Sequence, residues 1–374
     1  MEKAVSTVAV EERPKTKETR PEQTKSRVVY FDYLRLIACF FIVFIHVSYY
    51  GWVDPDVHSL RWEFYNACYS AARWATPVFV MISGALFLGR DRPVRTILRK
   101  NVLKIAVVLA FWSTLYALLD NFLLYDQSVS WRQVIKEIVA GHYHLWFLYM
   151  IIGLYLASPL LRKAAEDPRL TRYFLILALV TAVLVPKSIF LLERYRFPDM
   201  GRTLRQAWDQ TRLYIPLGYS GYFLLGYALH TATVKKRTEW LIYGLGILGA
   251  AATVLGNSLD SEWLGSPQVT YSEHFHLGVV LMAAAVFVFA KQHLNKAPGS
   301  EKGMGVLQAL SGATFGVYLV HPLFLDLLQV KGKIFPEQDL SVLVFLAAAA
   351  GAYLASLGTA LLLKRIPVVK KWLL

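Results

Sequence analysis

The sequence predicts an all-α integral membrane protein with about ten transmembrane helices and with both the N- and C-termini in the cytoplasm. Of its 374 residues, 56% are hydrophobic and only 18% are charged, which is more apolar surface than a soluble chain of this size buries. Lysine and arginine gather in alternate connections. Four segments without a formal charge are long enough to cross a bilayer: those between Arg35 and Asp54, Arg212 and Lys235, Glu239 and Asp260, and Asp339 and Lys364.

The apolar segments are predicted to be helices, because backbone amides facing lipid need partners within their own segment. The alternating pattern of a membrane β-strand is absent. Pro186 and Lys187 interrupt the fifth span. The ten predicted spans are Phe31–Tyr50, Cys68–Leu88, Val102–Leu119, Leu145–Leu161, Tyr173–Phe190, Tyr214–Val234, Trp240–Asn257, Phe275–Ala290, Val306–Leu325 and Ser341–Leu363.

The orientation follows from the basic connections, which are enriched on the cytoplasmic side of membrane proteins. They are the N-terminal segment, Arg90–Lys104, Arg162–Arg172, Lys235–Arg237, Lys291–Lys302 and Lys364–Lys371. The connection between the fifth and sixth spans departs from the rule, since it places Arg194, Arg196, Arg202, Arg205 and Arg212 outside. The net charge of +14 is therefore a topology signal, and nucleic-acid binding is not expected.

Two parts of the chain are predicted. Residues 1–28 are rich in Lys, Glu, Thr and Pro and bury too little apolar surface to fold, so they are expected to form a disordered cytoplasmic tail. Residues 29–374 form the membrane domain, whose first span is too long for a cleaved signal peptide. Cys39 and Cys68 lie in apolar segments without metal-site spacing, and no metal site is expected.

The first span holds the first candidate site residues, Arg35 and His46. Eleven helical steps bring them to the same helix face, about 16 Å apart along the axis. Arg35 at the cytoplasmic edge is suited to an anion, and His46 deeper in the span is suited to proton transfer. The structural alternative is an anchoring arginine and a histidine that bonds to a neighbouring helix.

Three further segments are PVFVMISGALFL at 77–88, HLWFLYMIIGLYLASP at 144–159 and SGATFGVYLVHP at 311–322. Together with the Arg35–His46 motif, and in this order on these helices, they make the chain resemble acyltransferase family 3. These multi-pass membrane proteins O-acetylate glycans. The resemblance runs from about Val29 to Leu363, and its pattern is closest to the enterobacterial-common-antigen type.

The resemblance implies a short acyl group, normally acetyl, carried by acetyl-CoA as a co-substrate from the cytoplasm. The acceptor it implies is a hydroxyl of a carbohydrate or lipid-linked glycan beyond a bacterial cytoplasmic membrane. His46 matches the family's essential histidine and Arg35 its paired arginine. His46 is expected to act as a general base, with an acyl-His46 intermediate as the alternative. No permanently bound cofactor is expected.

The phosphates of coenzyme A require a basic site on the cytoplasmic side. Besides Arg90 and Arg92, the connection after the second span offers four candidate donor-binding residues, and arginine suits forked phosphate contacts. The alternative is that these charges only set the topology. Many family members have paired arginines at the membrane end of this connection, where this chain has Asn101 and Lys104. The four candidates are Arg95, Arg99, Lys100 and Lys104.

The acceptor site has five candidates at the outer ends of spans or in the motifs above. Each has a structural alternative, such as an interfacial aromatic or a helix-packing residue. Ser83 and Gly84 are instead expected to permit close helix contact. The carboxylate partner of His46 is left open among Asp32, Asp120 and Glu273. The five acceptor-site candidates are Arg73, His144, Trp146, Tyr318 and His321.

Two other functions compete with acyl transfer. A transporter or flippase would use Arg35, Arg73, His46 and His321 to line a permeation path, but the inverted repeats and paired broken helices frequent in such proteins are not evident. A ligand-sensing membrane module is the third reading. The arginine-rich outer connection, with its interleaved aromatic residues, fits either a glycan site or a solvated cap.

Overall fold

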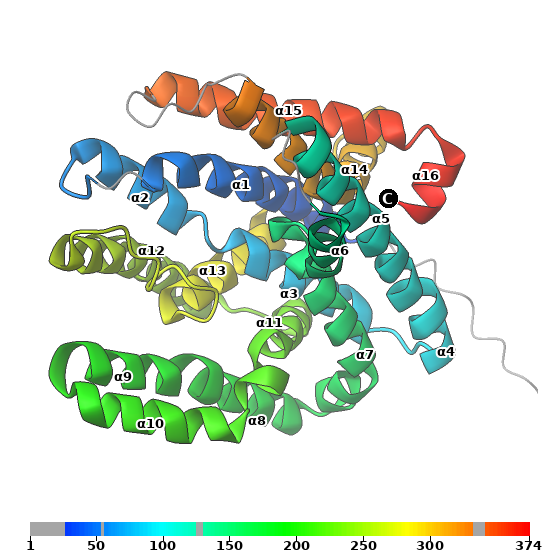
Figure 1. Ribbon diagram of the computed structural model, residues 1–374. Coiled ribbons are helices and arrows are strands. Elements are labelled where there is room, and N and C mark those ends of the chain that lie inside the picture. Colours follow the sequence, from blue (N-terminus) through cyan, green and yellow to red (C-terminus); the bar gives the residue numbers. More distant parts are fainter. Residues whose placement is uncertain (1–26, 54–55, 125–129, 332–340) are drawn as a thin grey trace, which may run out of the picture.

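The computed structural model describes residues 27–53, 56–124, 130–331 and 341–374. Residues 1–26, most of the predicted tail, lie outside them. Every regular element within the described ranges is helical, which confirms the all-α fold (Figure 1). The α-helices are α1 (Tyr30–Trp52), α2 (Leu60–Ala71), α3 (Ala75–Leu88), α4 (Val94–Thr96), α5 (Leu103–Leu119), α6 (Trp131–Ala140), α7 (Trp146–Glu166), α8 (Pro168–Ala178), α9 (Val185–Leu191), α10 (Pro198–Thr211), α11 (Tyr214–Thr231), α12 (Lys236–Leu264), α13 (Leu277–His293), α14 (Glu301–Asp326), α15 (Val342–Leu363) and α16 (Pro367–Trp372).

Short π- and 3₁₀-helical segments join several of these helices. The π segments are η1 (Ile97–Val102), η2 (Asp120–Leu124), η4 (Leu179–Leu184), η5 (Leu192–Arg196) and η6 (Leu327–Lys331), and η3 (Tyr143–Leu145) is a 3₁₀ turn. Eight helical runs among the described residues are long and apolar enough to span a membrane. The shorter apolar helix α13 coincides with the predicted eighth span, and α11 with the predicted sixth.

Two predicted spans contain breaks, of which only the one in the fifth span was marked in the sequence, by Pro186 and Lys187. The second span begins earlier, at Leu60, and α2 and α3 are separated by a turn at Ala72–Trp74. The fifth span changes from α-helix to the π segment η4 just before Pro186. A proline inside a helix removes one backbone hydrogen bond and crowds the carbonyl four residues earlier, which a wider π turn relieves.

Glycines allow the central helices α3 and α11 to pack with their backbones in contact. A Cβ atom at Gly84 would overlap the carbonyl oxygen of Phe223, and one at Gly226 would overlap that of Met81. Small residues at these positions therefore permit the close approach that stabilises helix pairs in lipid. The expectation that Gly84 serves helix packing is confirmed.

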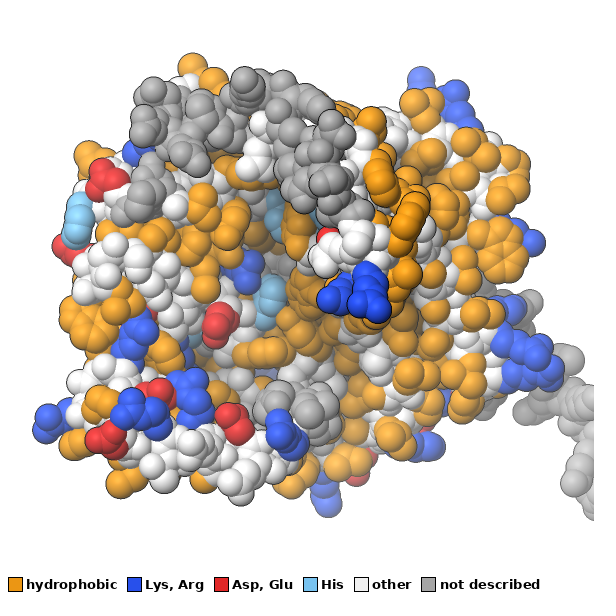
Figure 2. Space-filling model, viewed as in Figure 1, with side chains coloured by type: hydrophobic (Ala, Val, Ile, Leu, Met, Phe, Trp, Pro, Cys, Tyr) orange, Lys and Arg blue, Asp and Glu red, His pale blue; other side chains and the backbone are white. Residues whose placement is uncertain are grey.

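The basic connections lie at one end of the helix bundle. Arg162 pairs with Asp91 across two of them, and Lys291 Nζ donates to the carbonyl oxygen of Leu229 (2.8 Å) at the ends of α13 and α11. Most of the side chains on the face in Figure 2 are hydrophobic, with charged side chains gathered over α9 and α10 and at the right edge. The charged side chains over α9 and α10 belong to the connection that departs from the positive-inside rule.

Helix α10 folds back along α9 and carries much of the arginine-rich connection (Figure 1). Several of its charges are satisfied within the protein. Arg194 pairs with the buried Asp260 (3.0 Å), which also accepts hydrogen bonds from Tyr195 and Thr270. Arg205 pairs with Glu193. These contacts favour the cap interpretation of this connection.

Candidate active site

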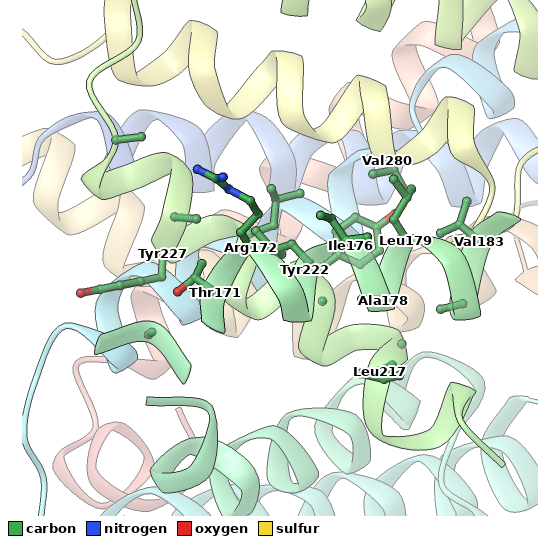
Figure 3. A pocket seen from close by; sticks show the side chains of 18 of the residues that line it. Thr171, Arg172, Ile176, Ala178, Leu179, Val183, Leu217, Tyr222, Tyr227 and Val280 are labelled. Atoms are coloured by element: carbon green, nitrogen blue, oxygen red, sulfur yellow. The ribbon is translucent and has the colours of Figure 1, made fainter. Parts of the chain in front are cut away.

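One groove, of about 650 Å³, lies between the α8–η4 segment and α11. Figure 3 shows Arg172 towards one end of it and Val183 towards the other. Its lining is mostly apolar, and Arg172 is the single charged residue in it among the described residues. None of the residues predicted to form the site lines this groove. The residues suited to acyl transfer lie elsewhere.

A second cavity, of about 310 Å³, runs through the bundle between α1, α3, α5, α7 and α14. It joins Arg35 and Lys104, which are predicted to lie at the cytoplasmic end, to a group of histidines. Seven of the eleven predicted site residues line it, although they come from four helices and a turn spread over most of the chain. They are Arg35, His46, Lys104, His144, Trp146, Tyr318 and His321.

Arg35 is held at its end of the cavity by the buried carboxylate of Asp32. The Arg35 guanidinium lies 3.4 Å from Asp32. Asp32 also accepts hydrogen bonds from Arg27 (2.6 Å) and from Ser311 on α14 (2.7 Å). An arginine oriented in this way keeps donor groups free for an anion in the cavity.

The predicted donor-binding residues divide into two groups. Lys104 lines the cavity, where its ammonium donates to the carbonyl oxygen of Leu374 (3.1 Å). Arg95, Arg99 and Lys100 are exposed and lie outside the cavity lining. Arg99 and Lys100 lie in the π segment η1.

His46 and His321 face one another in the cavity. Their ring centroids are 5.2 Å apart, and the ring of Tyr143 lies 5.3 Å from His46 on another side. His321 is fully buried, and its Nδ1 lies 2.8 Å from the carbonyl oxygen of Tyr318. A carbonyl only accepts, so Nδ1 carries the proton. The Nε2 atom, which has no hydrogen-bond partner in the described structure, therefore keeps a free lone pair.

His144 completes this histidine group from the turn before α7. Its ring lies 5.5 Å from that of His321, and its Nδ1 is 2.9 Å from Nδ1 of His142. Its Nε2 is buried without a hydrogen-bond partner among the described residues. Tyr318 holds the turn in place by donating to the backbone carbonyl of His144 (2.7 Å).

The outer rim of the cavity is aromatic. Trp146 lies against Tyr219 and His274, with ring centroids 5.6 and 5.4 Å apart, and the Tyr219 hydroxyl is 2.9 Å from Nδ1 of His274. Burial, and then the charge of nearby Arg73, holds the pKa of His274 well below its ordinary value. Arg73 itself does not line the cavity; its Nε donates to the carbonyl oxygen of Ser272 (2.6 Å).

The three carboxylates considered as partners of His46 lie in other parts of the structure. Asp32 pairs with the arginines of the cytoplasmic end. Asp120 lies near His142, and Glu273 lines a separate outer hollow. The residues beside His46 are instead His321 and Tyr143.

Sequence reasoning missed several residues of this region. His142, Tyr143, Tyr219, His274 and Asp326 all lie beside the predicted group. The spacing of His142 and His144 around one residue was a usable signal, because such a pair in a turn next to a span is unusual. The other four carry no local pattern and are brought in by helix packing.

The comparison with protein families decides between the competing functions. The model of an acyltransferase domain, Acyl_transf_3, matches residues 28–363. The chain belongs to acyltransferase family 3. It is therefore a multi-pass membrane acyltransferase, and the cavity that holds Arg35 and His46 is its candidate active site. No curated protein and no solved structure matches the chain.

Proposed function

We propose that this membrane acyltransferase transfers an acetyl or other short acyl group from cytoplasmic acetyl-CoA to a hydroxyl of an extracytoplasmic or lipid-linked glycan, in a bacterial cytoplasmic membrane. The observation that carries the proposal is the cavity joining Arg35 and Lys104 to His46 and His321. An anion-binding end and an imidazole end in one cavity are what a thioester with a phosphate-bearing tail requires. The motif pattern, closest to the enterobacterial-common-antigen type, favours acetyl and a cell-surface glycan.

The donor's phosphates have a second basic hollow at the same end of the bundle, of about 280 Å³. Its basic residues come from the connection between α3 and α4 and from the C-terminal end of α7, and Phe87 lies in its wall. The Phe87 ring stacks on Tyr155 of the main cavity, 4.5 Å between centroids. A donor could thus place its phosphates outside and its thioester inside. The basic residues of this hollow are Arg90, Arg92, Arg162 and Lys163.

This arrangement gives the predicted donor-binding residues two different roles. Arg35 and Lys104 contact the part of the donor that enters the cavity. Arg95, Arg99 and Lys100, being exposed, act at longer range by attracting an anion to this face.

His46 takes the proton of the acceptor hydroxyl as its oxygen attacks the thioester carbonyl. The carbon–sulfur bond then breaks, and the proton passes from the His46 imidazolium to the departing thiolate of coenzyme A. A positioned general base contributes about 10²–10⁴-fold to such a step. His321, whose ring lies beside His46 and whose Nε2 keeps a free lone pair, positions the acceptor or the acyl group. Transfer through an acyl-His46 intermediate uses the same residues.

The acceptor reaches His46 from the outer rim. Trp146, Tyr219 and His274 offer flat apolar faces with polar edges, which suit a sugar ring. Arg73, close to this rim, provides a cation for an acidic sugar or a carrier phosphate.

The test uses inverted membrane vesicles supplied with acetyl-CoA labelled in the acetyl group. Label should appear on lipid-linked or wall carbohydrate with wild-type protein and be released by mild alkali, as expected for an ester. The His46→Ala variant should lose it, whereas the exposed His58→Ala should not. Transport of an unmodified substrate without thioester consumption would support the flippase alternative instead.

A further inference from the structure

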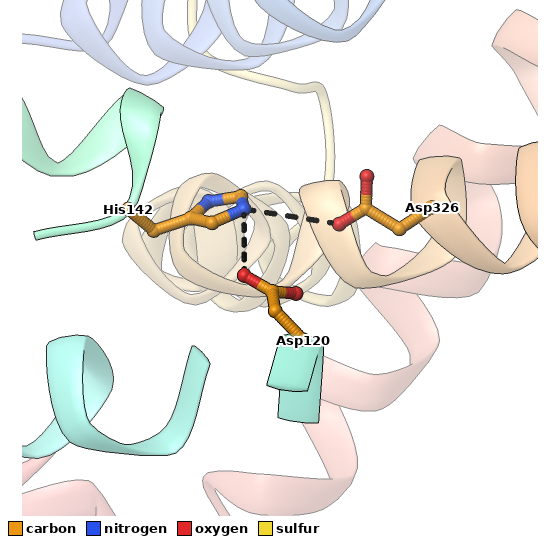
Figure 4. A group of neighbouring side chains, drawn as sticks. All are labelled: Asp120, His142 and Asp326. Atoms are coloured by element: carbon orange, nitrogen blue, oxygen red, sulfur yellow. Dashed lines mark ion pairs between the residues drawn. The ribbon is translucent and has the colours of Figure 1, made fainter. Parts of the chain in front are cut away.

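Three potential metal ligands meet beyond the histidine group, near the predicted extracytoplasmic ends of their helices. Asp120 begins η2 after α5, Asp326 ends α14, and His142 lies in the connection before α7. One oxygen of each carboxylate and Nε2 of His142 all lie within 4.8 Å of one another. Figure 4 shows both carboxylates directed towards the same nitrogen.

The polar atoms of this cluster lack the hydrogen bonds that burial requires. Asp326 is only 6% exposed, and its Oδ2 is buried without a hydrogen-bond partner in the described structure, as is Oδ1 of Asp120. His142 Nε2 lies 3.6 Å from Asp120 and 3.9 Å from Asp326, both beyond hydrogen-bond length. A buried carboxyl group without hydrogen bonds is either protonated or paired with a cation, and one metal ion between these groups would supply the missing partner for all three.

We propose that Asp120, His142 and Asp326 bind one divalent metal ion, Zn²⁺ in preference to Mg²⁺ or Ca²⁺. An imidazole nitrogen with two carboxylates suits zinc, whereas the harder cations take oxygen ligands. The inference is independent of the donor and acceptor proposed above, and it revises the expectation from the sequence that no metal binds.

The geometry supports a small cation. Zinc binds nitrogen and carboxylate oxygen at about 2.0–2.2 Å, so two ligands in a tetrahedral site lie roughly 3.3–3.5 Å apart. The separations of 3.6 and 3.9 Å from Nε2 need to shorten by about 0.1–0.6 Å to reach this range, and the two carboxylate oxygens, which lie within 4.8 Å of each other, also need to approach. The fourth position is left for water or for another ligand.

The surroundings of His142 fix its ring for this role. Its ring stacks on Tyr116, 4.3 Å between centroids and 14° from parallel. Metal bound at Nε2 requires the proton on Nδ1, which then donates to Nδ1 of His144, 2.9 Å away. His144 must in turn carry its own proton on Nε2. Metal binding would thus turn the buried Nε2 of His144 into a hydrogen-bond donor beside His321.

The experiment measures metal on untagged full-length protein in detergent, first stripped with a chelator and then equilibrated with Zn²⁺. One equivalent per chain is expected in the wild type. Asp326→Asn and His142→Ala should each weaken zinc binding by more than about 100-fold, since even outer-shell changes cost 10–100-fold. The matched controls Asp199→Asn and His293→Ala, which lie outside the cluster, should keep the full equivalent.

A second measurement uses the wild type alone, so that misfolded variants do not decide the result. Co²⁺ should give the visible absorption of a four-coordinate site, and Zn²⁺ should displace it and raise the melting temperature in a concentration-dependent way. Absence of stoichiometric zinc, retention of zinc by Asp326→Asn, or tighter binding of Mg²⁺ or Ca²⁺ would overturn the proposal.

Discussion

The imidazole rings of His46 and His321 lie 5.2 Å apart in one cavity, although 275 residues separate them along the chain. The His46–His321 pair brings together a base expected from the family and a second imidazole with a fixed proton. The two rings have different neighbours, so their substitutions should have different effects.

We expect His46→Gln to reduce acyl transfer by about 10²–10⁴-fold, because glutamine keeps much of the volume but cannot accept and release a proton. His321→Gln should reduce transfer by a smaller factor, about 10-fold, since its role is to position. Single-turnover rates with labelled donor measure both. Equal losses of transfer rate in the two variants would instead indicate that His46 and His321 act together as the general base.

Salt dependence should separate the two groups of cytoplasmic-end cations. Replacing Arg95, Arg99 and Lys100 together by Gln should raise the KM for donor at low salt and have little effect at about 0.5 M salt, where long-range attraction is screened. Arg35→Ala should raise the KM at both salt concentrations, because Arg35 lies inside the cavity with Asp32 behind it. A donor KM of Arg35→Ala that recovers at high salt would contradict a direct contact.

Asp260→Ala should destabilise the outer cap by about 1–3 kcal/mol, because Arg194, Tyr195 and Thr270 lose their common acceptor. Thermal unfolding in detergent measures this loss of stability. The control is Asp199→Ala, whose exposed pair with Arg202 should not affect the melting temperature. Equal melting temperatures for both variants would show that the buried network does not hold the cap.

Gly84→Ala should be disruptive because its methyl group would meet the backbone of Phe223 on α11. Overpacking of this kind costs about 1–3 kcal/mol or more, so we expect a lower melting temperature and a poor yield of monodisperse protein. Gly244→Ala is the matched control, since nothing lies within 4 Å of its Cβ position. A normal melting temperature for Gly84→Ala would mean that α3 and α11 separate without penalty.

The sequence predicted the helices well because lipid imposes one simple rule on them, a long apolar segment with its own hydrogen bonds. The break at Ala72–Trp74 has no such rule, whereas Pro186 and Lys187 marked the interruption of the fifth span. In the site, too, the sequence predicts relationships within a helix better than contacts between helices. Arg35 and His46 share one helix, so helical periodicity alone places them on one face.

His321, His144 and Trp146 were within reach because they lie in segments with a recognisable pattern. Asp326 and His274 were not, since their importance arises only from where α14 ends and how the segment before α13 folds. Arg95, Arg99 and Lys100 show the opposite difficulty. The basic pattern identified the correct end of the molecule but could not tell which charges turn inward.

Helix α14 touches every part of this arrangement. Ser311 bonds to Asp32, Tyr318 to the carbonyl of His144, and Asp326 faces His142. These contacts span about 22 Å of one helix at 1.5 Å per residue. Ser311 and Tyr318 lie on the part of α14 before Pro322, so a small rotation of that part changes the arginine end and the histidine turn in a single movement. The two ends of the cavity, at Arg35 and at the histidines, are therefore coupled through a single helix, and a shift at one end is transmitted to the other.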